Sequence, residues 1–154
     1  MLQDDVDICE LLRRGGVLHD VQGSTPQEIY KSACSKLEIP SEITREELYD
    51  ALCDREQILT TAVGNGIALP HPQYPIIKDD SNQRVFVCYL KEPVSMNALD
   101  NKKVFVMFII LSSNVQSHLQ IIAKLARLIR KETFKSALEH RAEINVLLSL
   151  AGKK

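Results

Sequence analysis

The sequence predicts an α/β (α+β) fold, a three-layer α/β/α sandwich around a small mixed β-sheet. Two runs rich in β-branched and aromatic residues, 84–90 and 104–111, lie in the middle of the chain, and such runs are typical of strands. Helical patterns precede and follow them, which favours helices packed on both sides of a sheet. Because 154 residues are enough for one sizeable core, we expect residues 1–154 to form a single domain.

The chain is predicted to begin with a helix and a strand. Residues 6–14 carry apolar side chains at helical spacing, with Asp4 or Asp5 as a possible N-cap, and a Gly-Gly pair ends the helix. Residues 17–21 alternate apolar and polar types, as in a short strand. We expect His19, on that strand, to be a surface or edge residue and not a catalytic one.

Two further helices have start signals with a known physical basis. Thr25 can cap a helix N-terminus, Pro26 suits the first helical position, and Glu28 can complete a capping box. Thr44 starts the next helix in the same way, and that helix is expected to reach Arg55. The alternative to a functional role for Arg55 is a solvated helix end.

The second half of the chain holds the two long strands and the last helices. The run 104–111 has almost no polar interruption, which indicates a strand covered on both faces. The polar connection 92–103 is expected to be either a hairpin loop or a longer crossover. Helices are predicted to follow the polar turn 112–117, beginning around His118, and then over 133–138 and 142–150.

Composition excludes several classes of protein. With 19 basic and 20 acidic residues, the chain lacks the basic excess that nucleic-acid binding usually needs. Three aspartates stand among the first seven residues, where a secretion signal would be positive, and the longest apolar run is too short to span a bilayer. We therefore expect a cytoplasmic protein without direct membrane insertion. The cysteines form no CxxC pair and are expected to be buried or half-buried thiols: Cys9, Cys34, Cys53 and Cys88.

One histidine is presented in an unusual way. A polar, Gly-rich loop at 60–66 leads into a short apolar run at 67–69, which stops at Pro70. His71 lies between Pro70 and Pro72. Proline fixes its own φ and biases the preceding residue away from helix, so His71 is expected to be extended at the end of a short strand. A histidine held on a stiff backbone is a candidate for chemistry.

Histidine side chains support three kinds of chemistry that bear on this sequence. Metal binding is disfavoured because the four histidines are scattered, with no HxxxH or HxH spacing. A serine hydrolase is disfavoured because no GxSxG motif is present. A nucleophilic histidine remains, since neutral imidazole attacks well near neutral pH and would form a phosphohistidine with a phosphoryl group.

A phosphoryl site needs donors that hold the transferred oxygens. His118, at the start of its predicted helix, could add a ring donor beside free backbone N–H groups, and Arg55 could add positive charge. The loop before His71 offers hydroxyl, amide and approachable backbone donors: Thr60, Thr61, Gly64, Asn65 and Gly66. A Gly-Asn-Gly loop is more often only a turn, so both interpretations of this loop stay open.

The same residues resemble a known family. Arg55-Glu56, Thr61, the run from Gly64 to His71 (Gly-Asn-Gly-Ile-Ala-Leu-Pro-His) and His118-Leu119 with Leu125-Ala126 are similar to the enzyme IIA family of the bacterial phosphotransferase system. The class is that of the fructose, mannitol and nitrogen-regulatory proteins. The resemblance covers essentially the whole chain.

The resemblance implies a function and roles for residues. The chain would accept a phosphoryl group from phospho-HPr or its nitrogen-branch relative on Nε2 of His71. His118 matches the second active-site histidine, which supports the phosphoryl group, and Arg55 matches an active-site arginine. Thr61, Gly64 and Asn65 are the expected phosphoryl-binding residues. The resemblance implies no metal and no organic cofactor.

Two positions depart from the usual family pattern. Ala62 stands where the family often has glycine, and alanine adopts positive φ less readily. Pro72 stands where a small residue often follows the histidine, and it removes one backbone donor beside His71. Pro72 therefore bears on how partner proteins dock.

Three functional classes are left open. A phosphorylation-dependent regulator, as in the nitrogen-regulatory branch, is favoured because no feature of the sequence indicates a particular sugar substrate. The alternative is a transport phosphocarrier that passes the group to a separate IIB component. A non-catalytic binding module is a third alternative, and the presence together of His71, His118 and Arg55 argues against it.

Overall fold

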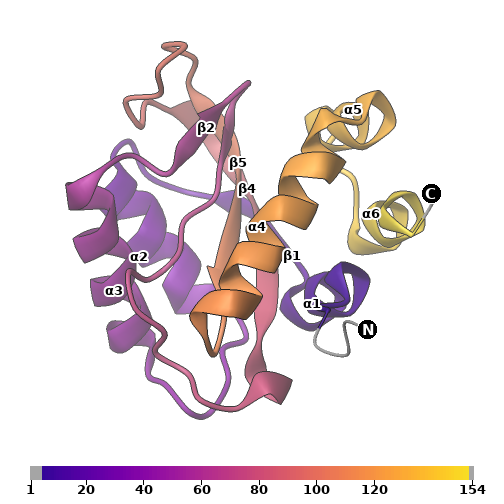
Figure 1. Cartoon of the computed structure of the whole chain (residues 1–154). Coiled ribbons are helices and arrows are strands. Elements are labelled where there is room, and N and C mark those ends of the chain that lie inside the picture. Colours follow the sequence, from indigo (N-terminus) through magenta and orange to yellow (C-terminus); the bar gives the residue numbers. More distant parts are fainter. Residues whose placement is uncertain (1–4, 153–154) are drawn as a thin grey trace.

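The computed structural model describes residues 5–152, and these residues form the three-layer α/β/α arrangement that the sequence predicts (Figure 1). Within this range the sheet has five strands in the order β1-β4-β5-β3-β2. The β1–β4 and β3–β5 pairs are parallel, whereas β4–β5 and β2–β3 are antiparallel, so the sheet is mixed. The strands are β1 (Val17–Val21), β2 (Ala62–Gly64), β3 (Ile67–Ala68), β4 (Arg84–Val94) and β5 (Val104–Leu111).

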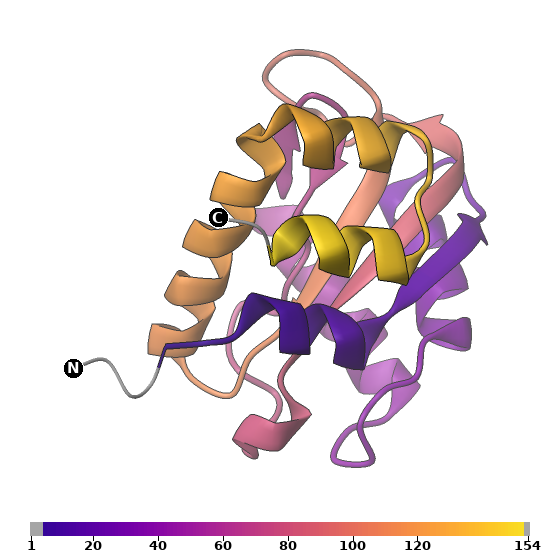
Figure 2. The ribbon, with the colours of Figure 1, turned by 90° about the vertical axis from the view of Figure 1, so that its right-hand side faces the viewer.

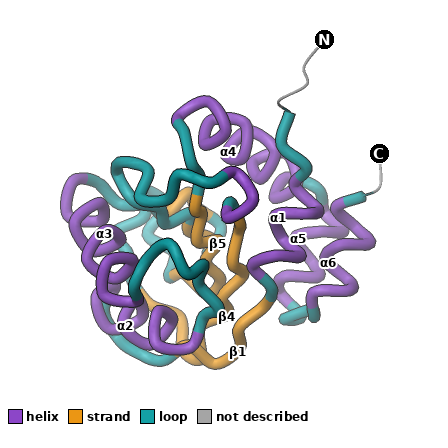
Figure 3. Tube along the Cα trace, turned by 90° about the horizontal axis from the view of Figure 1, so that it is seen from below, coloured by secondary structure: helices purple, strands orange, loops and turns teal. Residues whose placement is uncertain are grey.

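Helices cover both faces of the sheet, as Figure 3 shows in a view from below. α2 (Pro26–Lys36) and α3 (Arg45–Ile58) lie on one face. The other face carries α1 (Ile8–Gly15), α4 (Val115–Arg130), α5 (Glu132–Glu139) and α6 (Ile144–Ala151). On that side α1, α6 and α5 lie next to one another, with α4 along their ends (Figure 2).

The alternation of β4 and β5 divides the interior into two cores. Both strands are buried along most of their length, as predicted for 104–111, and successive side chains point to opposite faces. Phe86 and Cys88 enter the core beneath α2 and α3. Val85 and Val87 enter the core beneath α1, α4, α5 and α6. Covering both faces explains why these strands read as nearly continuous apolar runs.

Helix start signals were mostly read correctly. The Thr25 hydroxyl accepts a hydrogen bond from the Glu28 N–H, and Pro26 is the first residue of α2. The Glu28 carboxylate accepts from the N–H and the hydroxyl of Ser24, one residue before the cap, so the reciprocal bond of the predicted capping box is made to Ser24. Thr44 forms a full capping box with Glu47 at the start of α3. The N-cap of α1 was predicted wrongly: Asp7, and not Asp5, accepts from the first-turn N–H groups. Asp4, the other suggested cap, lies outside the described residues.

The largest differences from prediction are at three places. β4 continues to Val94 and pairs there with Val104, so the connection between β4 and β5 is a hairpin loop. The loop 60–66 contains the short strand β2, which was not predicted. α4 begins at Val115, capped by the Asn114 side chain, three residues before the predicted start at His118.

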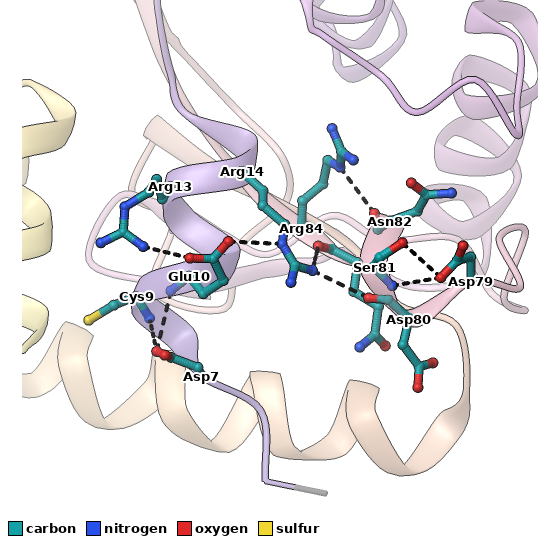
Figure 4. A network of polar contacts seen from close by, with 11 residues as sticks. Asp7, Cys9, Glu10, Arg13, Arg14, Asp79, Asp80, Ser81, Asn82 and Arg84 are labelled. Atoms are coloured by element: carbon teal, nitrogen blue, oxygen red, sulfur yellow. Dashed lines mark hydrogen bonds and ion pairs between the residues drawn. The ribbon is translucent and has the colours of Figure 1, made fainter.

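A polar network fastens α1 to the segment before β4 (Figure 4). Arg14 donates from its guanidinium to Glu10 on its own helix, at 3.2 Å, and to the carbonyls of Asp80 and Gln83, at 3.3 and 2.9 Å. Asp80 belongs to a short 3₁₀ helix, η1 (Asp80–Asn82). Three acceptors for one cation hold the start of β4 against α1.

A close approach of α1 to β4 depends on one glycine. A Cβ on Gly15 would lie 1.9 Å from the carbonyl oxygen of Val85. We expect Gly15→Ala to lower the free energy of unfolding by roughly 3 kcal/mol, because the helix must move away from the strand. Denaturant unfolding of the purified variant measures this loss.

A second glycine is a matched control for this prediction. A Cβ on Gly152, just after α6, would have its nearest neighbour at 3.5 Å, which is an ordinary contact, and the backbone of Gly152 has a helical φ of −80°. Gly152→Ala is therefore expected to change the free energy of unfolding by less than about 1 kcal/mol. Equal losses for the two variants would show that the approach to Val85 does not determine the effect.

The helices and the cysteines of the described residues bear on membrane spanning and on thiol chemistry. Within residues 5–152, no helix is both long enough and apolar enough to cross a membrane. Cys34, Cys53 and Cys88 are buried. Burial raises the pKa of the Cys34 thiol to about 12, so this group is a poor nucleophile at neutral pH.

Candidate active site

Two histidines from distant parts of the sequence meet at one end of the sheet. His71 follows β3, and His118 lies in the first turns of α4, which follows β5. Because β3 and β5 are parallel neighbours, their carboxyl ends lie at the same edge of the sheet. The ring centroids of His71 and His118 are 4.5 Å apart, with an angle of 50° between the planes. The predicted pair is thus adjacent in the structure.

The backbone determines which ring nitrogen of His71 is free. Nδ1 lies 2.8 Å from the carbonyl oxygen of Leu69. A carbonyl oxygen can only accept a hydrogen bond, so Nδ1 carries the proton and donates it. In the neutral ring Nε2 then holds the lone pair. His71 is therefore oriented so that Nε2 is the ring nitrogen that could act as a nucleophile.

Both imidazoles favour the neutral form. Desolvation is the main cause that lowers the pKa of His71, and the charge of Arg55 adds to it. The Leu69 carbonyl and Glu56 act in the opposite direction on His71. For His118, desolvation, then His71 and Arg55, lower the pKa to about 4. At pH 7 the two rings are uncharged, which is the state that a nucleophilic imidazole requires.

The low pKa of His118 predicts a pH dependence of stability. The pKa falls from 6.5 in the unfolded chain to about 4 in the fold, so the unfolded state binds more protons between these values. Stability is therefore lost as pH falls from about 6.5 towards 4. The ring is half-exposed, so we expect a modest contribution of about 1 kcal/mol between pH 7 and pH 5.

Denaturant unfolding at pH 7 and pH 5 measures this contribution. The wild-type chain is expected to lose about 1 kcal/mol more than His118→Asn over this interval. Each protein serves as its own reference at pH 7, so a general cost of the substitution cancels. Equal losses in the two proteins would contradict the assignment.

Arg55 lies in the last turn of α3. Its charge acts on both histidines, while its side chain is hydrogen-bonded at the end of its own helix. Its Nη1 donates to the carbonyl of Leu59 at 2.6 Å. Its charge contributes to the lowered pKa of both His71 and His118, which shows that it lies within electrostatic reach of both rings. The predicted position at a helix C-terminus is confirmed, although α3 continues to Ile58.

Thr61 is held by a carboxylate, that of Glu56, for which no role of its own was predicted. Glu56 accepts hydrogen bonds from the Thr61 N–H at 2.9 Å, the Thr61 hydroxyl at 2.7 Å and the Tyr30 hydroxyl at 2.5 Å. The Thr61 carbonyl in turn accepts from the N–H of Leu69, at 2.9 Å. This network connects α2, α3 and the segment that leads to His71.

Gly64 and Asn65 are not brought to His71. Gly64, Asn65 and Gly66 all have positive φ, and they form the turn of the β2–β3 hairpin. The Asn65 N–H donates to the carboxylate of Asp100 at 2.8 Å. The turn thus lies at the start of β3, whereas His71 lies beyond its end. Phosphoryl binding by Gly64 and Asn65 stays a prediction, and the contacts present are those of a turn.

A small pocket opens beside the two imidazoles, with a volume of about 100 Å³. It is lined by His71, Pro72, Gln73, Tyr74, Pro75, Ile110, Ser112, Val115 and His118. A larger polar hollow of about 480 Å³ lies between α1, η1 and the start of α4, and no predicted site residue lines it. No group of three or more His, Cys, Asp or Glu side chains within residues 5–152 is arranged to hold a metal ion.

Comparisons with known proteins agree with one another. The family model for the phosphoenolpyruvate-dependent sugar phosphotransferase system, EIIA 2, matches residues 10–151. A nitrogen regulatory protein homolog of Haemophilus influenzae is 31% identical over 134 residues, which cover 86% of this chain and 80% of that protein.

Solved structures share the fold at lower identity. The nitrogen regulatory protein IIA-Ntr of Neisseria meningitidis superposes with a TM-score of 0.79 at 24% identity, over 94% of this chain and 98% of that one. The complex of enzyme IIAMTL and phosphorylated enzyme IIBMTL of Escherichia coli contains a chain with a TM-score of 0.66 at 18% identity, covering 90% of this chain and 94% of that one.

Proposed function

This chain belongs to the EIIA 2 family of the phosphoenolpyruvate-dependent sugar phosphotransferase system, and on that basis we propose that it is a phosphohistidine carrier. In this proposal His71 accepts a phosphoryl group from phospho-HPr or a nitrogen-branch relative, and the phosphorylation state regulates a target protein. The observation that carries the proposal is the contact between Nδ1 of His71 and the Leu69 carbonyl, at 2.8 Å. This contact leaves Nε2 as the nucleophile.

The proposed step is a direct transfer between two nitrogens. The N–P bond of the donor phosphohistidine breaks while a bond forms from Nε2 of His71 to phosphorus. Charge on the transferred oxygens is the main problem for such a step, and positioned donors stabilise it. We assign this role to a ring N–H of His118 and to the Arg55 guanidinium. Neither group requires a metal.

In this proposal three residues contribute mainly by setting the course of the backbone that leads to His71: Thr61, Gly64 and Asn65. The hydrogen bonds between Thr61 and Glu56 fix the chain that enters the hairpin. The turn at Gly64, Asn65 and Gly66 sets the start of β3, and the two strand residues, Leu69 and Pro70 then lead to His71. A wrong turn would displace the histidine from His118, because the register of β3 against β5 fixes its position.

The regulatory role is favoured over a second candidate, a transport carrier. Regulation is supported by the name of the Haemophilus influenzae relative, a nitrogen regulatory protein homolog. Transport is supported by the Escherichia coli complex in which an enzyme IIA is bound to a phosphorylated enzyme IIB. Both candidates use the same phosphohistidine and differ only in the protein that receives or senses it.

Phosphoryl acceptance is tested by labelling the wild-type chain. The chain is incubated with phosphoenolpyruvate, enzyme I and an HPr-like carrier, and the product is mapped by mass spectrometry at alkaline pH. We expect one phosphoryl group on His71 that is labile in acid and stable in base. A chain that takes no label from HPr or its nitrogen-branch relative would refute the proposal.

The two roles are separated by the fate of the label. Phosphorylated chain is mixed with the IIB proteins of the same cell, and loss of label from His71 is followed over time. A regulator is expected to keep its label on the timescale of seconds and to bind a target protein differently in its two states. Rapid transfer to a IIB component would instead establish the transport role.

A further inference from the structure

The polar hollow between α1, η1 and the start of α4 has the size of a small-molecule site. Its volume of about 480 Å³ lies within the range of roughly 300–1,000 Å³ that is usual for pockets that bind small molecules. Neither His71 nor His118 lines it. Two buried aliphatic side chains, Val6 and Leu11, form part of its wall, and the rest of the lining is polar or charged. Such a wall suits a ligand with both methylene groups and polar groups.

The charges around the polar hollow are unbalanced. Among the described residues that line it, four carry a carboxylate, and Arg14 carries the one guanidinium. Glu10 is paired with Arg13 at 2.6 Å and with Arg14 at 3.2 Å. The other three carboxylates form no ion pair within residues 5–152: Asp5, Asp7 and Asp80. The hollow therefore attracts cationic groups.

Gln83 supplies a buried donor to the polar hollow. The residue is 6% exposed and lines the hollow. Its Oε1 accepts hydrogen bonds from the N–H and the hydroxyl of Ser113, at 2.9 and 3.2 Å. A backbone N–H can only donate, so this contact identifies the oxygen of the amide. Nε2 makes no hydrogen bond to any described residue. A buried amide donor is costly to leave unpaired, so Nε2 points to a ligand with an acceptor atom.

Arg14 offers a second donor beside Gln83. Its Nε donates to Glu10, and its Nη1 donates to the carbonyls of Asp80 and Gln83 (Figure 4). Nη2 makes no hydrogen bond in the described part of the chain. The guanidinium is thus fixed in place with one amino group available. Because Arg14 and Gln83 are in contact and line the same hollow, their free N–H groups form a site that suits a carboxylate.

A ligand that fits these groups carries charges of both signs. A small anion such as phosphate would bind Arg14 but would face three unpaired carboxylates. A diamine would leave the donors of Arg14 and Gln83 without an acceptor. Within residues 5–152, no group of three or more His, Cys, Asp or Glu side chains is arranged to hold a metal ion. A basic α-amino acid has one carboxylate, two cationic groups and a chain of methylenes, so it complements every part of the lining.

We propose that the polar hollow binds a basic α-amino acid, such as L-lysine, L-ornithine or L-arginine. In this complex the α-carboxylate accepts hydrogen bonds from Arg14 and Gln83. The α-ammonium group and the side-chain cation lie among the unpaired carboxylates, and the methylenes pack against Val6 and Leu11. The inference does not rest on the phosphocarrier proposal, because no residue of the polar hollow has a role in phosphoryl transfer.

L-lysine and two analogues test the complex one group at a time. Binding to the purified chain is measured by isothermal titration calorimetry with L-lysine, with cadaverine, which lacks the carboxylate, and with L-norleucine, which lacks the side-chain ammonium group. We expect L-lysine to bind at least about tenfold more tightly than either analogue, because each analogue loses a charge-assisted contact. In an NMR titration the largest backbone shifts are expected within residues 5–14, 80–83 and 114–117.

An aspartate variant tests the cationic side of the site. Asp7→Asn keeps the N-cap of α1, because asparagine caps a helix as well as aspartate does, but it removes one unpaired charge. L-lysine is expected to bind about tenfold more weakly to this variant. Asp79→Asn is the matched control, since it makes the same change at the N-cap of η1, outside the lining of the hollow. Equal affinities of the two variants would overturn the proposal.

An arginine variant tests the carboxylate side. Arg14→Lys keeps a positive charge but removes Nη2. We expect binding of L-lysine and L-norleucine to weaken about tenfold and binding of cadaverine to stay at the wild-type value. A general loss of structure would weaken all three. Arg13→Lys is the matched control, because Arg13 lies on the same helix but does not line the hollow.

The remaining outcomes are also decisive. Absence of saturable binding of L-lysine, L-ornithine and L-arginine up to roughly 10 mM would overturn the proposal. Equal affinities for L-lysine and cadaverine would show an acidic surface that attracts any cation, without a carboxylate site. NMR shifts centred on His71 and His118 would place the ligand at the other end of α1's neighbour α4, in the phosphoryl site, and would refute the assignment to the polar hollow.

Discussion

Replacing His71 by alanine is expected to abolish phosphorylation of this chain, with a loss of at least about a thousandfold in the transfer rate. The variant removes Nε2, the atom whose lone pair is free because Nδ1 faces the Leu69 carbonyl. No other histidine shares that arrangement with an adjacent imidazole at 4.5 Å among residues 5–152. The rate is measured with phosphoenolpyruvate, enzyme I and the HPr-like carrier, as for the wild-type chain.

Two further variants test whether the loss is specific to His71 as the acceptor. His118→Ala is expected to keep the label on His71 but to slow transfer roughly a hundredfold, because one donor to the developing charge is lost. His140→Ala is the control, since His140 is exposed and its Nδ1 contacts only the Ser136 carbonyl in its own helix region. A label that persists in His71→Ala, or that disappears in His140→Ala, would show that His71 is not the acceptor.

Replacing Glu56 by alanine is expected to lower the free energy of unfolding by about 3 kcal/mol. The change removes the acceptor of three hydrogen bonds, two from Thr61 and one from Tyr30. Thr61 is 5% exposed and Tyr30 is fully buried. Each buried donor left without a partner costs about 1–3 kcal/mol. Water can partly reach the three donors from the side of Glu56, so their summed cost is expected near the lower end of the range.

Comparison variants separate the network from the helix. Glu46→Ala is the same substitution at an exposed position of α3 and is expected to cost less than about 1 kcal/mol. Tyr30→Phe removes one donor and leaves Thr61 bound, so a loss of about 1 kcal/mol is expected. The double variant of Tyr30 and Glu56 should lose less than the sum of the two single losses. Equal stability of the Glu56 and Glu46 variants would refute the role of this network.

The features that were predicted from the sequence are those that depend on residues close together in the chain. The caps at Thr25 and Thr44 depend on residues within one helical turn, so their signals are visible in a few letters. The strand 104–111 was recognised because burial on both faces leaves an uninterrupted apolar run. His71 was singled out as a candidate because the prolines on each side restrict its backbone, and this restriction is visible in the sequence without any tertiary contact.

The missed features depend on contacts between distant residues. Glu56 was quoted beside Arg55 in the family resemblance but was given no role of its own, because nothing in its neighbourhood signals that Tyr30, on another helix, donates to it. The start of α4 was placed too late, because a valine at the first helical position carries no start signal and Asn114 was one of several possible caps. Gly64 and Asn65 have the composition of both a turn and an anion-binding loop, and only the register of β3 shows which end of the strand they occupy.

The contact between Nδ1 of His71 and the Leu69 carbonyl also has a consequence for release of the phosphoryl group. Once Nε2 carries phosphorus, the imidazole departs as a good leaving group only while Nδ1 keeps its proton. The carbonyl oxygen, 2.8 Å away, stabilises the proton on Nδ1 and so disfavours an anionic ring. In the proposed function, the same backbone atom that directs capture would therefore also keep the N–P bond easy to break. The phosphoryl group could then pass on to another protein, or return to the donor, with its transfer potential conserved.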